Sequence, residues 1–338
     1  MEYQSLLGRH YILGKQCGRG GEATIFEVVN YSGAIAKLYK PELCNSYREE
    51  KLRTMLRLGV PANLEEQIAY PKDVLYRSGK FVGFVMRRVN GIPLNEIWDD
   101  ELLDIEKRIT IAKNMYALLY EINKANLVVA DLNPFNVLID PVTGFVRLID
   151  VDSWHISDQK SGKVFRCEVC IPEYSIVANS IPKGETLKTA PLPTFSPETD
   201  RYSMAILLFK LLLNSHPFAV GVAKGNTTES VPQPTELMRK YQFPYVQGQC
   251  PAGYQPPIYS LPYKCLTYRL QNLFQKTFNG ENVPIEWYFN ALSAYEKEIT
   301  NTCKKNPLHK YKKGLYSCPY CKANKRKEAF FKAQHKKS

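Results

Sequence analysis

The sequence predicts an α+β fold, with a small antiparallel sheet and one helix followed by a larger, mainly helical part and a short C-terminal appendage. Three observations favour this class. Short β-type runs separated by turns are concentrated before residue 90, and amphipathic helical patterns dominate from about residue 109 to 299. A cysteine-containing, lysine-rich stretch covers residues 301–338. The chain therefore changes from strands to helices along its length.

Composition indicates a folded protein of the cytoplasm. A chain of 338 residues with 44% apolar content can bury a large core and divides best into two or three units. The most apolar stretch, residues 202–213, is too short for a membrane span and contains Lys210. The N-terminus lacks the order of a signal peptide, and nine scattered cysteines argue against a disulfide framework. We therefore expect a reducing, cytoplasmic location and no membrane span.

Positive charge is concentrated at the C-terminus. Of the net charge of +12, residues 301–338 contribute +11 through twelve Lys or Arg and one Glu. Such a tail can bind nucleic acid, an acidic partner or a membrane surface. Most tails of this kind are solvated and partly disordered, which is what we expect here, so nucleic acid is an unfavoured partner.

The N-terminal half predicts strands around a glycine-rich bend. Gly18, Gly20 and Gly21 precede a hairpin in which residues 30–33 form the turn and the following AIAK places Lys37 on the third strand. Glycines let backbone amides approach a polyphosphate closely, although a glycine cluster alone also marks ordinary turns. The combination with Lys37 favours a phosphate site.

The helix predicted over residues 47–58 offers a carboxylate partner for that lysine. Its apolar stripe consists of Leu52, Met55 and Leu56, and Glu49 lies on the same side, whereas Glu50 does not. We therefore predict Glu49 as the partner of Lys37. The alternative is that both glutamates are solvated and pair with neighbouring helix cations.

Residues 127–152 carry the most informative polar groups. Apolar runs before residue 140 and after residue 145 predict a hairpin, with Asp131 and Asn136 before it and Asp150 after it. The hairpin would bring Asn136 and Asp150 together as two oxygen ligands suited to Mg²⁺, with Asp131 beside an attacking hydroxyl. Taken alone, DLNPFN can equally be a turn whose Asp and Asn satisfy local backbone groups.

DLNPFN and VRLIDVD together resemble the catalytic loop HRDLxxxN and the metal loop DFG of the protein kinase superfamily. The resemblance implies a two-lobed protein-kinase-like fold that binds ATP and Mg²⁺. By this resemblance, Asp131 is the catalytic base or hydroxyl-orienting acid, Asn136 and Asp150 bind the metal, and Lys37 contacts the α- and β-phosphates. By the same resemblance, Met86 guards the adenine pocket, and the segment 87–89, with Arg88 at its centre, offers backbone groups to the base.

The chain departs from the family pattern at several positions. Val129 and Ala130 replace the His and Arg before the catalytic Asp, and Asn133 replaces the Lys two residues after it. By its position in the motif, we group Asn133 with Asp131 and Lys37 as catalytic residues, although an Asn in place of Lys removes one positive charge from beside the transferred phosphate. Asp152 replaces the glycine of DFG, and Val283 replaces an Arg before Pro284. None of these changes removes the predicted base or metal ligands.

The remaining C-terminal patterns are helical with irregular connections. A stripe over residues 109–122 predicts a helix leading to the catalytic loop. Residues 198–218 resemble the central buried helix of kinases, in which Asp200 would brace that loop; Asp200 can also cap the helix. Residues 232–262, with seven prolines, indicate a long irregular insert. Two further helices are predicted over residues 267–278 and 284–299.

LIDVDSWHI over residues 148–156, PEY over residues 172–174 and ETDRYSMAILLFKLLL over residues 198–213 resemble a group of bacterial kinase-like domains that have an LIDxDS metal loop, a PEY segment and a cysteine-containing tail. Such domains are often associated with von Willebrand-type and phosphatase partners. The resemblance covers about residues 10–300 and implies an N-lobe over 1–88, a C-lobe over 89–300 and a tail over 301–338.

The tail offers four soft metal ligands. Cys303, His309, Cys318 and Cys321 can surround one Zn²⁺, which would make the appendage zinc-ribbon-like and supply the stability that a small core cannot. The alternatives are a redox CxxC pair or free thiols. The separate CxxC pair at residues 167 and 170 lacks a second ligand pair, so we expect no metal there.

We therefore predict an ATP-dependent, Mg²⁺-assisted kinase that phosphorylates Ser or Thr hydroxyls of protein substrates. Two alternatives remain open. The chain can be a pseudokinase scaffold that binds nucleotide without transfer, or a small-molecule phosphotransferase, because DLNPFN also resembles the DLxPxN loop of antibiotic and choline kinases.

Overall fold

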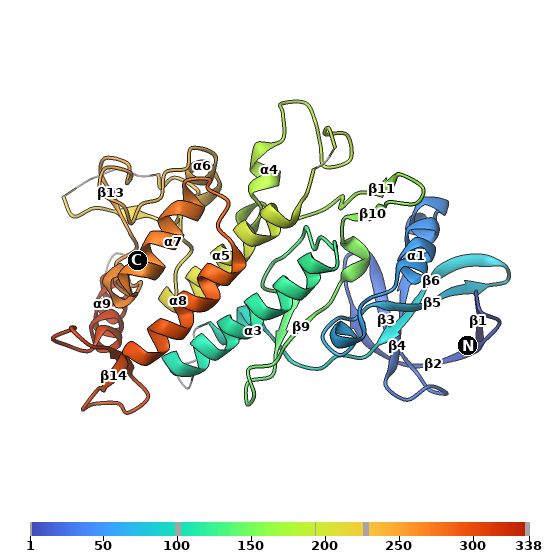
Figure 1. Cartoon of the computed structure of the whole chain (residues 1–338), viewed down its shortest axis with the longest axis horizontal. Coiled ribbons are helices and arrows are strands. Elements are labelled where there is room, and N and C mark those ends of the chain that lie inside the picture. Colours follow the sequence, from blue (N-terminus) through green and yellow to red (C-terminus); the bar gives the residue numbers. More distant parts are fainter. Residues whose placement is uncertain (1, 99–102, 193, 226–229, 335–338) are drawn as a thin grey trace.

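The computed structural model describes residues 2–98, 103–192, 194–225 and 230–334. A β-rich part formed by the N-terminal residues lies at one end of the molecule, and a mainly helical part lies at the other (Figure 1). Six strands build the β-rich part: β1 (Glu2–Ser5), β2 (His10–Arg19), β3 (Ala23–Val28), β4 (Ala34–Tyr39), β5 (Pro71–Arg77) and β6 (Lys80–Arg87). The fold is thus a mixture of α and β structure in the predicted order.

The predicted small antiparallel sheet is a closed barrel with strand order β1-β2-β3-β4-β6-β5. Strand β1 closes it, because Gln4 pairs with His10 on β2 and with Tyr76 on β5. The sequence predicted an antiparallel sheet but no strand at these first residues, so closure of the sheet into a barrel was not predicted. Alternating buried residues of the strands fill the barrel: Tyr3, Tyr11, Val28, Ala36, Leu75 and Val85.

One helix, α1 (Ser46–Leu58), packs against strands β5 and β6 of the barrel. Its start is capped by Asn45, whose side chain accepts a hydrogen bond from the Arg48 amide. It ends at Gly59, whose φ of 71° suits a residue without a Cβ. Leu52 and Met55 are fully buried, which confirms the predicted apolar stripe.

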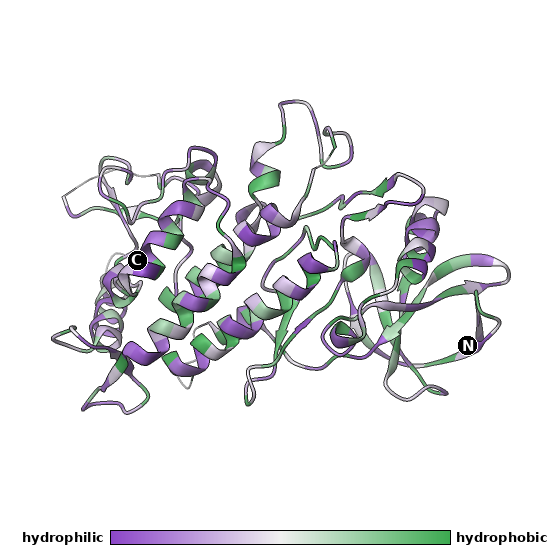
Figure 2. Ribbon diagram, viewed as in Figure 1, coloured by the Kyte–Doolittle hydropathy of each residue, from purple (hydrophilic) through white to green (hydrophobic). Residues whose placement is uncertain are grey.

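The second part is built from helices α2 (Leu94–Ile97), α3 (Ile105–Lys124), α4 (Ile176–Ser180), α5 (Pro197–Leu213), α6 (Pro234–Arg239), α7 (Tyr268–Phe278), α8 (Ile285–Glu298) and α9 (Pro319–Gln334). Helix α5 is buried on nearly all sides between its neighbours, as the sequence predicts for a central helix. Figure 2 shows hydrophobic and hydrophilic residues along α3, α7 and α8, as expected of helices with one buried face.

Short strands, in one three-stranded sheet and several hairpins, lie between these helices. They comprise the sheet of β7 (Ile92–Pro93), β8 (Val137–Ile139) and β9 (Val146–Leu148), and the hairpins of β10 (Ile156–Asp158) with β11 (Lys163–Phe165), β12 (Gly221–Val222) with β13 (Tyr254–Gln255), and β14 (Ile299–Thr302) with β15 (Lys310–Lys312). Within the described ranges, 3₁₀ turns cover Pro41–Leu43, Ala62–Leu64, Val151–Ser153, Pro172–Tyr174 and Tyr263–Cys265. The insert over 232–262 therefore contains α6 and β13 and is not wholly irregular.

The lysine-rich tail is more ordered than predicted. Its helix α9 runs to Gln334, and Tyr320 and Ala323 on that helix join the core. The β14–β15 hairpin contacts α3 and α8, and Lys310 on β15 forms an ion pair with Glu106 at the start of α3. The expectation of a partly disordered tail was therefore wrong for residues up to 334. Among the described residues, none of the helices has both the length and the apolar character to cross a bilayer.

Candidate functional site

A cavity of about 670 Å³ lies between the barrel and the helical part. Eight of the predicted site residues line it: Gly20, Gly21, Lys37, Met86, Arg88, Asp131, Asn136 and Asp150. The structure therefore brings together residues from strands, hairpins and loops that are more than 100 positions apart. Three other predicted residues, Gly18, Glu49 and Asn133, lie outside its lining.

The glycine-rich bend connects β2 and β3 at one edge of the cavity. The Gly20 amide donates to the Ala23 carbonyl at 2.9 Å and closes the turn, whereas Gly18 pairs with Ile25 within the strands. A Cβ added at Gly21 would meet no atom within 4 Å, so the backbone there borders open space. This free space at a backbone turn fits the close approach of a phosphate.

Lys37 lies at the charged end of the cavity and is held by two acids. Its Nζ lies 2.5 Å from Asp150 Oδ1, 2.7 Å from Asp152 Oδ1 and 2.9 Å from Asp152 Oδ2. Burial alone would lower the pKa of Lys37, but the carboxylates of Asp152 and Asp150 outweigh it and raise the pKa above its ordinary value. The lysine therefore stays charged.

The predicted pair between Lys37 and Glu49 is not formed. The Glu49 carboxylate instead accepts a hydrogen bond from Tyr76 at 2.7 Å and lies 2.8 Å from Arg53. The physical reason is the rotation of α1 about its axis. The stripe of Leu52 and Met55 was correctly predicted, but Glu49 contacts Tyr76 on strand β5 and does not line the cavity.

Helix α1 turns cations toward the cavity. Arg48 and Lys51 both line it, and the buried Lys51 Nζ donates to the Arg166 carbonyl at 3.3 Å. Burial lowers the pKa of Lys51 to about 8. Arg48 pairs with Glu22 of the glycine-rich bend at 2.8 Å, so this ion pair links α1 to the edge of the cavity.

The loop before β8 places Asp131 and Asn136 side by side. Asn136 Nδ2 lies 3.2 Å from the Asp131 carbonyl and 3.3 Å from its Oδ2, while the Ile171 amide donates to Oδ1. Burial raises the pKa of Asp131. Asn133 is buried below this loop, where it donates to the Asp131 carbonyl and accepts from the Phe135 amide. It therefore holds the loop and does not face the cavity.

Asp200 braces the same loop, as predicted. Its two carboxylate oxygens accept hydrogen bonds from the amides of Val129 at 2.7 Å and Ala130 at 2.8 Å. Asp200 is fully buried, and burial raises its pKa to about 7 even though these two bonds act in the opposite direction. The first turn of α5 therefore fixes the backbone just before Asp131.

The β8–β9 hairpin brings the two predicted metal ligands together. Val137 pairs with Leu148, and the Ile149 amide donates to the Asn136 carbonyl at 3.0 Å. Asn136 directs its amide nitrogen at Asp131, which leaves its side-chain oxygen for a ligand. An amide oxygen and the Asp150 carboxylate, both in the lining of one cavity, form a donor set that suits Mg²⁺.

The other end of the cavity is apolar. Ile25, Ile35, Met86 and Leu138 line it, as a flat heterocyclic base requires. Arg88 lies at its rim, but its amide donates to the Gly33 carbonyl at 2.7 Å and its guanidinium pairs with Glu27 at 2.8 Å. The Arg88 N–H is thus occupied within the protein, so the predicted contact between the backbone of residues 87–89 and a base would have to use other backbone groups of this segment.

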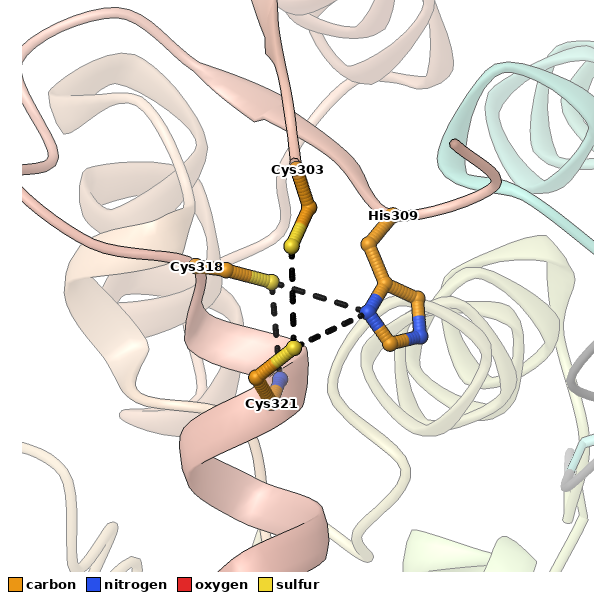
Figure 3. Close-up of side chains that lie close together, drawn as sticks. All are labelled: Cys303, His309, Cys318 and Cys321. Carbon is orange, nitrogen blue, oxygen red and sulfur yellow. Dashed lines mark hydrogen bonds between the residues drawn. The ribbon is translucent and has the colours of Figure 1, made fainter. Parts of the chain in front are cut away.

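A second site lies in the tail, where Cys303, His309, Cys318 and Cys321 converge (Figure 3). Their ligand atoms all lie within 4.8 Å of one another. Cys303 Sγ is 3.6 Å from Cys321 Sγ, and His309 Nδ1 is 3.6 Å from Cys318 Sγ and 3.5 Å from Cys321 Sγ. Zn–S bonds of about 2.3 Å in a tetrahedron place ligand atoms about 3.8 Å apart, so the cluster has the size of a zinc site.

Sequence reasoning missed two residues at the charged end of the main cavity. Asp152 binds Lys37 with both oxygens, and Lys51 occupies the cavity side of α1 where a carboxylate was expected. Asp152, the second acid of DVD, was considered only as the replacement of the glycine of DFG. Its position two residues after Asp150, in a 3₁₀ turn, is the signal that could have identified it.

Comparison with known proteins supports a kinase-like relationship. No protein-family model matches the chain. The chain is 25% identical to protein kinase YegI of Escherichia coli K12 over 339 aligned positions, which cover 91% of this chain and 48% of that protein. Protein kinase YegI of Escherichia coli O157:H7 is also 25% identical, over 338 positions with the same coverage. The chain thus spans about half the length of the curated relatives it matches, and their names suggest a phosphotransferase.

Proposed function

We propose that this chain is an ATP-dependent protein kinase that transfers the γ-phosphoryl group to Ser or Thr hydroxyls. One observation carries the proposal: Lys37, Asp131, Asn136 and Asp150 line a single cavity of about 670 Å³ with a glycine bend at its edge. The similarity to proteins named as kinases supports the same class. The proposed division into an N-lobe over 1–88 and a C-lobe over 89–300 would place this cavity between the lobes.

The proposed chemistry is positioning combined with charge neutralisation. The Lys37 ammonium would contact the α- and β-phosphates, and the free backbone at Gly21 would face the phosphates. Asn136 and Asp150 would hold Mg²⁺, which supplies charge neutralisation when bound. Asp131 would accept the hydrogen bond of the attacking hydroxyl and orient it. Its raised pKa matches a group that must take up a proton.

The test compares nucleotide binding with phosphoryl transfer. Binding of ATP and Mg²⁺ should raise the melting temperature, and labelled ATP should transfer phosphate to the protein itself or to a Ser/Thr peptide library. Asp131→Asn should reduce transfer by about 10²- to 10⁴-fold and leave the thermal shift intact. Asp140→Asn is the matched control, because Asp140 lies outside the cavity and Asn keeps the oxygen that accepts from Val142 and Thr143. Equal transfer by wild type and Asp131→Asn would remove the assigned role.

The same assays separate the two alternatives. A thermal shift without transfer to any acceptor would favour the nucleotide-binding scaffold. Transfer to small alcohols or aminoglycosides but not to peptides would favour a small-molecule phosphotransferase. The brace from Asp200 to the catalytic loop, which the family resemblance associates with protein kinases, is the observation that favours a protein substrate.

We further propose that the cluster in the tail binds one structural Zn²⁺. Its support is the ligand spacing together with two backbone N–H···S bonds, from Lys305 to Cys303 and from Cys321 to Cys318, which stabilise thiolates. Elemental analysis of protein purified without added metal should give one zinc per chain, and Cys318→Ser should remove it. Protein free of zinc would contradict the assignment.

The partners remain part of the proposal. A cognate phosphatase or a von Willebrand-type protein would be a partner by resemblance. Co-purification with the full-length protein tests this association. Nucleic-acid binding is the rival use of the basic tail, and it would weaken steeply with salt.

A further inference from the structure

Asp152 occupies the centre of the charged end of the main cavity. Its side chain is only 6% exposed, and both of its oxygens contact the Lys37 ammonium, at 2.7 and 2.9 Å. The Tyr39 hydroxyl donates to Oδ2 of the same carboxylate at 2.6 Å, which locks its orientation. Burial would raise the pKa of Asp152, but the charge and hydrogen bonds of Lys37 and Tyr39 lower it overall, so the residue is ionised.

Helix α1, which is described throughout its length, provides no acid for this role. Its residues that line the cavity are Tyr47, Arg48, Lys51 and Leu52. Two of these are cations, and a second ammonium near Lys37 is tolerated because the Asp152 carboxylate also lies close to Lys51. The charge of Lys51 contributes to the lowered pKa of Asp152. Glu49 is committed to Tyr76 and Arg53.

The two acids that contact Lys37 differ in exposure and in the number of contacts. The Asp150 side chain is 42% exposed and touches the ammonium with one oxygen, whereas Asp152 is buried and uses two. Asp150 is therefore free to reorient toward a metal cation in the cavity, whereas Asp152 remains bound to Lys37. A 3₁₀ turn over Val151–Ser153, after Asp150 in the left-handed region, aims both side chains at Lys37.

We propose that Asp152 is the positioning residue that holds the Lys37 ammonium toward a nucleotide, in place of a glutamate from α1. This rests on the proposed function, since it assumes that the cavity takes a nucleoside triphosphate. The division of labour is that Asp152 keeps Lys37 extended and charged while Asp150 is released to the metal. A buried carboxylate with a fixed second donor is well suited to this because its geometry does not depend on solvent.

The test is a double-mutant cycle on the affinity for a non-hydrolysable ATP analogue, measured by calorimetry with and without Mg²⁺. Asp152→Asn should weaken binding by about 10- to 100-fold, which corresponds to the loss of one charge-assisted hydrogen bond. The factor should be the same with and without Mg²⁺. In a Lys37→Met background the same change should have no further effect. Asp150→Asn should weaken binding only when Mg²⁺ is present. Glu49→Gln is the matched control and should retain the wild-type affinity.

A second measurement does not depend on nucleotide binding. The pH profile of Lys37 acylation, followed by mass spectrometry on the full chain, reports the pKa of its amine. Asp152→Asn removes a carboxylate that raises this pKa, so labelling should begin at a lower pH than in wild type or Glu49→Gln. An unchanged profile, or an affinity loss that persists in the Lys37→Met background, would overturn the proposal. If wild type binds no ATP analogue, the proposed function fails, while the labelling profile still decides whether Asp152 holds Lys37.

Discussion

Asp200 Oδ1 accepts a hydrogen bond from the Ala130 amide at 2.8 Å, and Ala130 has a φ of 65°, in the left-handed region that alanine rarely adopts. The first turn of α5 thus holds a strained residue directly before Asp131. Strain of this kind persists only where the surrounding structure determines the backbone conformation, and it is concentrated at functional sites. Asp200 does not line the cavity, but through this hydrogen bond it fixes the backbone that positions Asp131 in it.

Replacing Asp200 should therefore destabilise the protein. Asp200→Ala leaves the Val129 and Ala130 amides without an acceptor in a buried position, and we expect the free energy of unfolding in urea to fall by about 2 to 4 kcal/mol. Asp200→Asn keeps one acceptor oxygen and should lose less. Glu66→Gln, at an exposed acid, serves as the control. A larger loss for Asn than for Ala would contradict the proposed brace.

The buried ammonium of Lys51 predicts a pH-dependent stability. The pKa of Lys51 is about 8 in the folded protein and 10.5 is its ordinary value, so the unfolded chain binds the proton more tightly. The full cost of burying the charge applies below pH 8 and is relieved as the pH rises from about 8 to 10.5. Lys51→Met should thus be more stable than wild type by up to about 3 kcal/mol below pH 8, with the difference shrinking above it.

Unfolding in urea at a series of pH values measures this difference. Lys163, whose side chain is 43% exposed, offers the control Lys163→Met, for which the difference from wild type should not follow this pH course. A constant difference between Lys51→Met and wild type from pH 7 to 10 would show that the ammonium is not buried at a cost.

Gly83 on β6 is predicted to be irreplaceable for steric reasons. A Cβ at this position would lie 2.0 Å from the Lys37 carbonyl oxygen on the neighbouring strand. Gly83→Ala must therefore displace the strand that carries Lys37, and we expect a loss of more than about 3 kcal/mol in unfolding free energy. Gly21→Ala, where a Cβ meets open space, should stay within about 0.5 kcal/mol of wild type. Similar losses for the two variants would refute the steric argument.

Removing the zinc proposed for the tail should weaken the whole helical part. The β14–β15 hairpin contacts α3 and α8, and on α9 Ala323 is part of the main core and Tyr320 packs against it. A strong zinc chelator should lower the melting temperature by about 5 °C or more, because ligand binding free energy is part of folding free energy.

Cysteine variants separate metal loss from other effects of the chelator. Cys321→Ser should reproduce the lowered melting temperature and make it insensitive to the chelator. Cys17→Ser, at an exposed cysteine outside the cluster, should behave as wild type. A melting temperature unaffected by chelation and by Cys321→Ser would argue against a structural metal.

Local patterns in the sequence were sufficient for the elements that depend on near neighbours. The stripe over 109–122 predicted α3, and the turn between two apolar runs predicted the β8–β9 hairpin and hence the proximity of Asn136 and Asp150. These features follow from helical periodicity and hairpin geometry, which act over a few residues.

The failures all depend on distant contacts. Glu49 was chosen because it lies near the apolar stripe, but the phase of α1 relative to the cavity is set by packing against β5 and β6, which the helix sequence does not encode. Asp152 was not identified because its contact with Lys37 depends on a 3₁₀ turn that directs its side chain at a strand more than 100 residues earlier. Residues 87–89 were predicted to offer backbone groups to a base, and nothing in the sequence indicated that the Gly33 carbonyl accepts the Arg88 N–H.

Closure of the barrel by β1 has a kinetic consequence. The pairs Gln4–Tyr76 and Ser5–Leu75 join residues separated by about 70 positions, so during synthesis β1 has one edge without its native neighbour until β5 follows. Bringing such distant segments together is entropically costly and slow compared with forming a hairpin. The β1–β5 pairing should therefore be among the last contacts of the barrel to form, and the nascent chain carries an unpaired strand edge in the meantime.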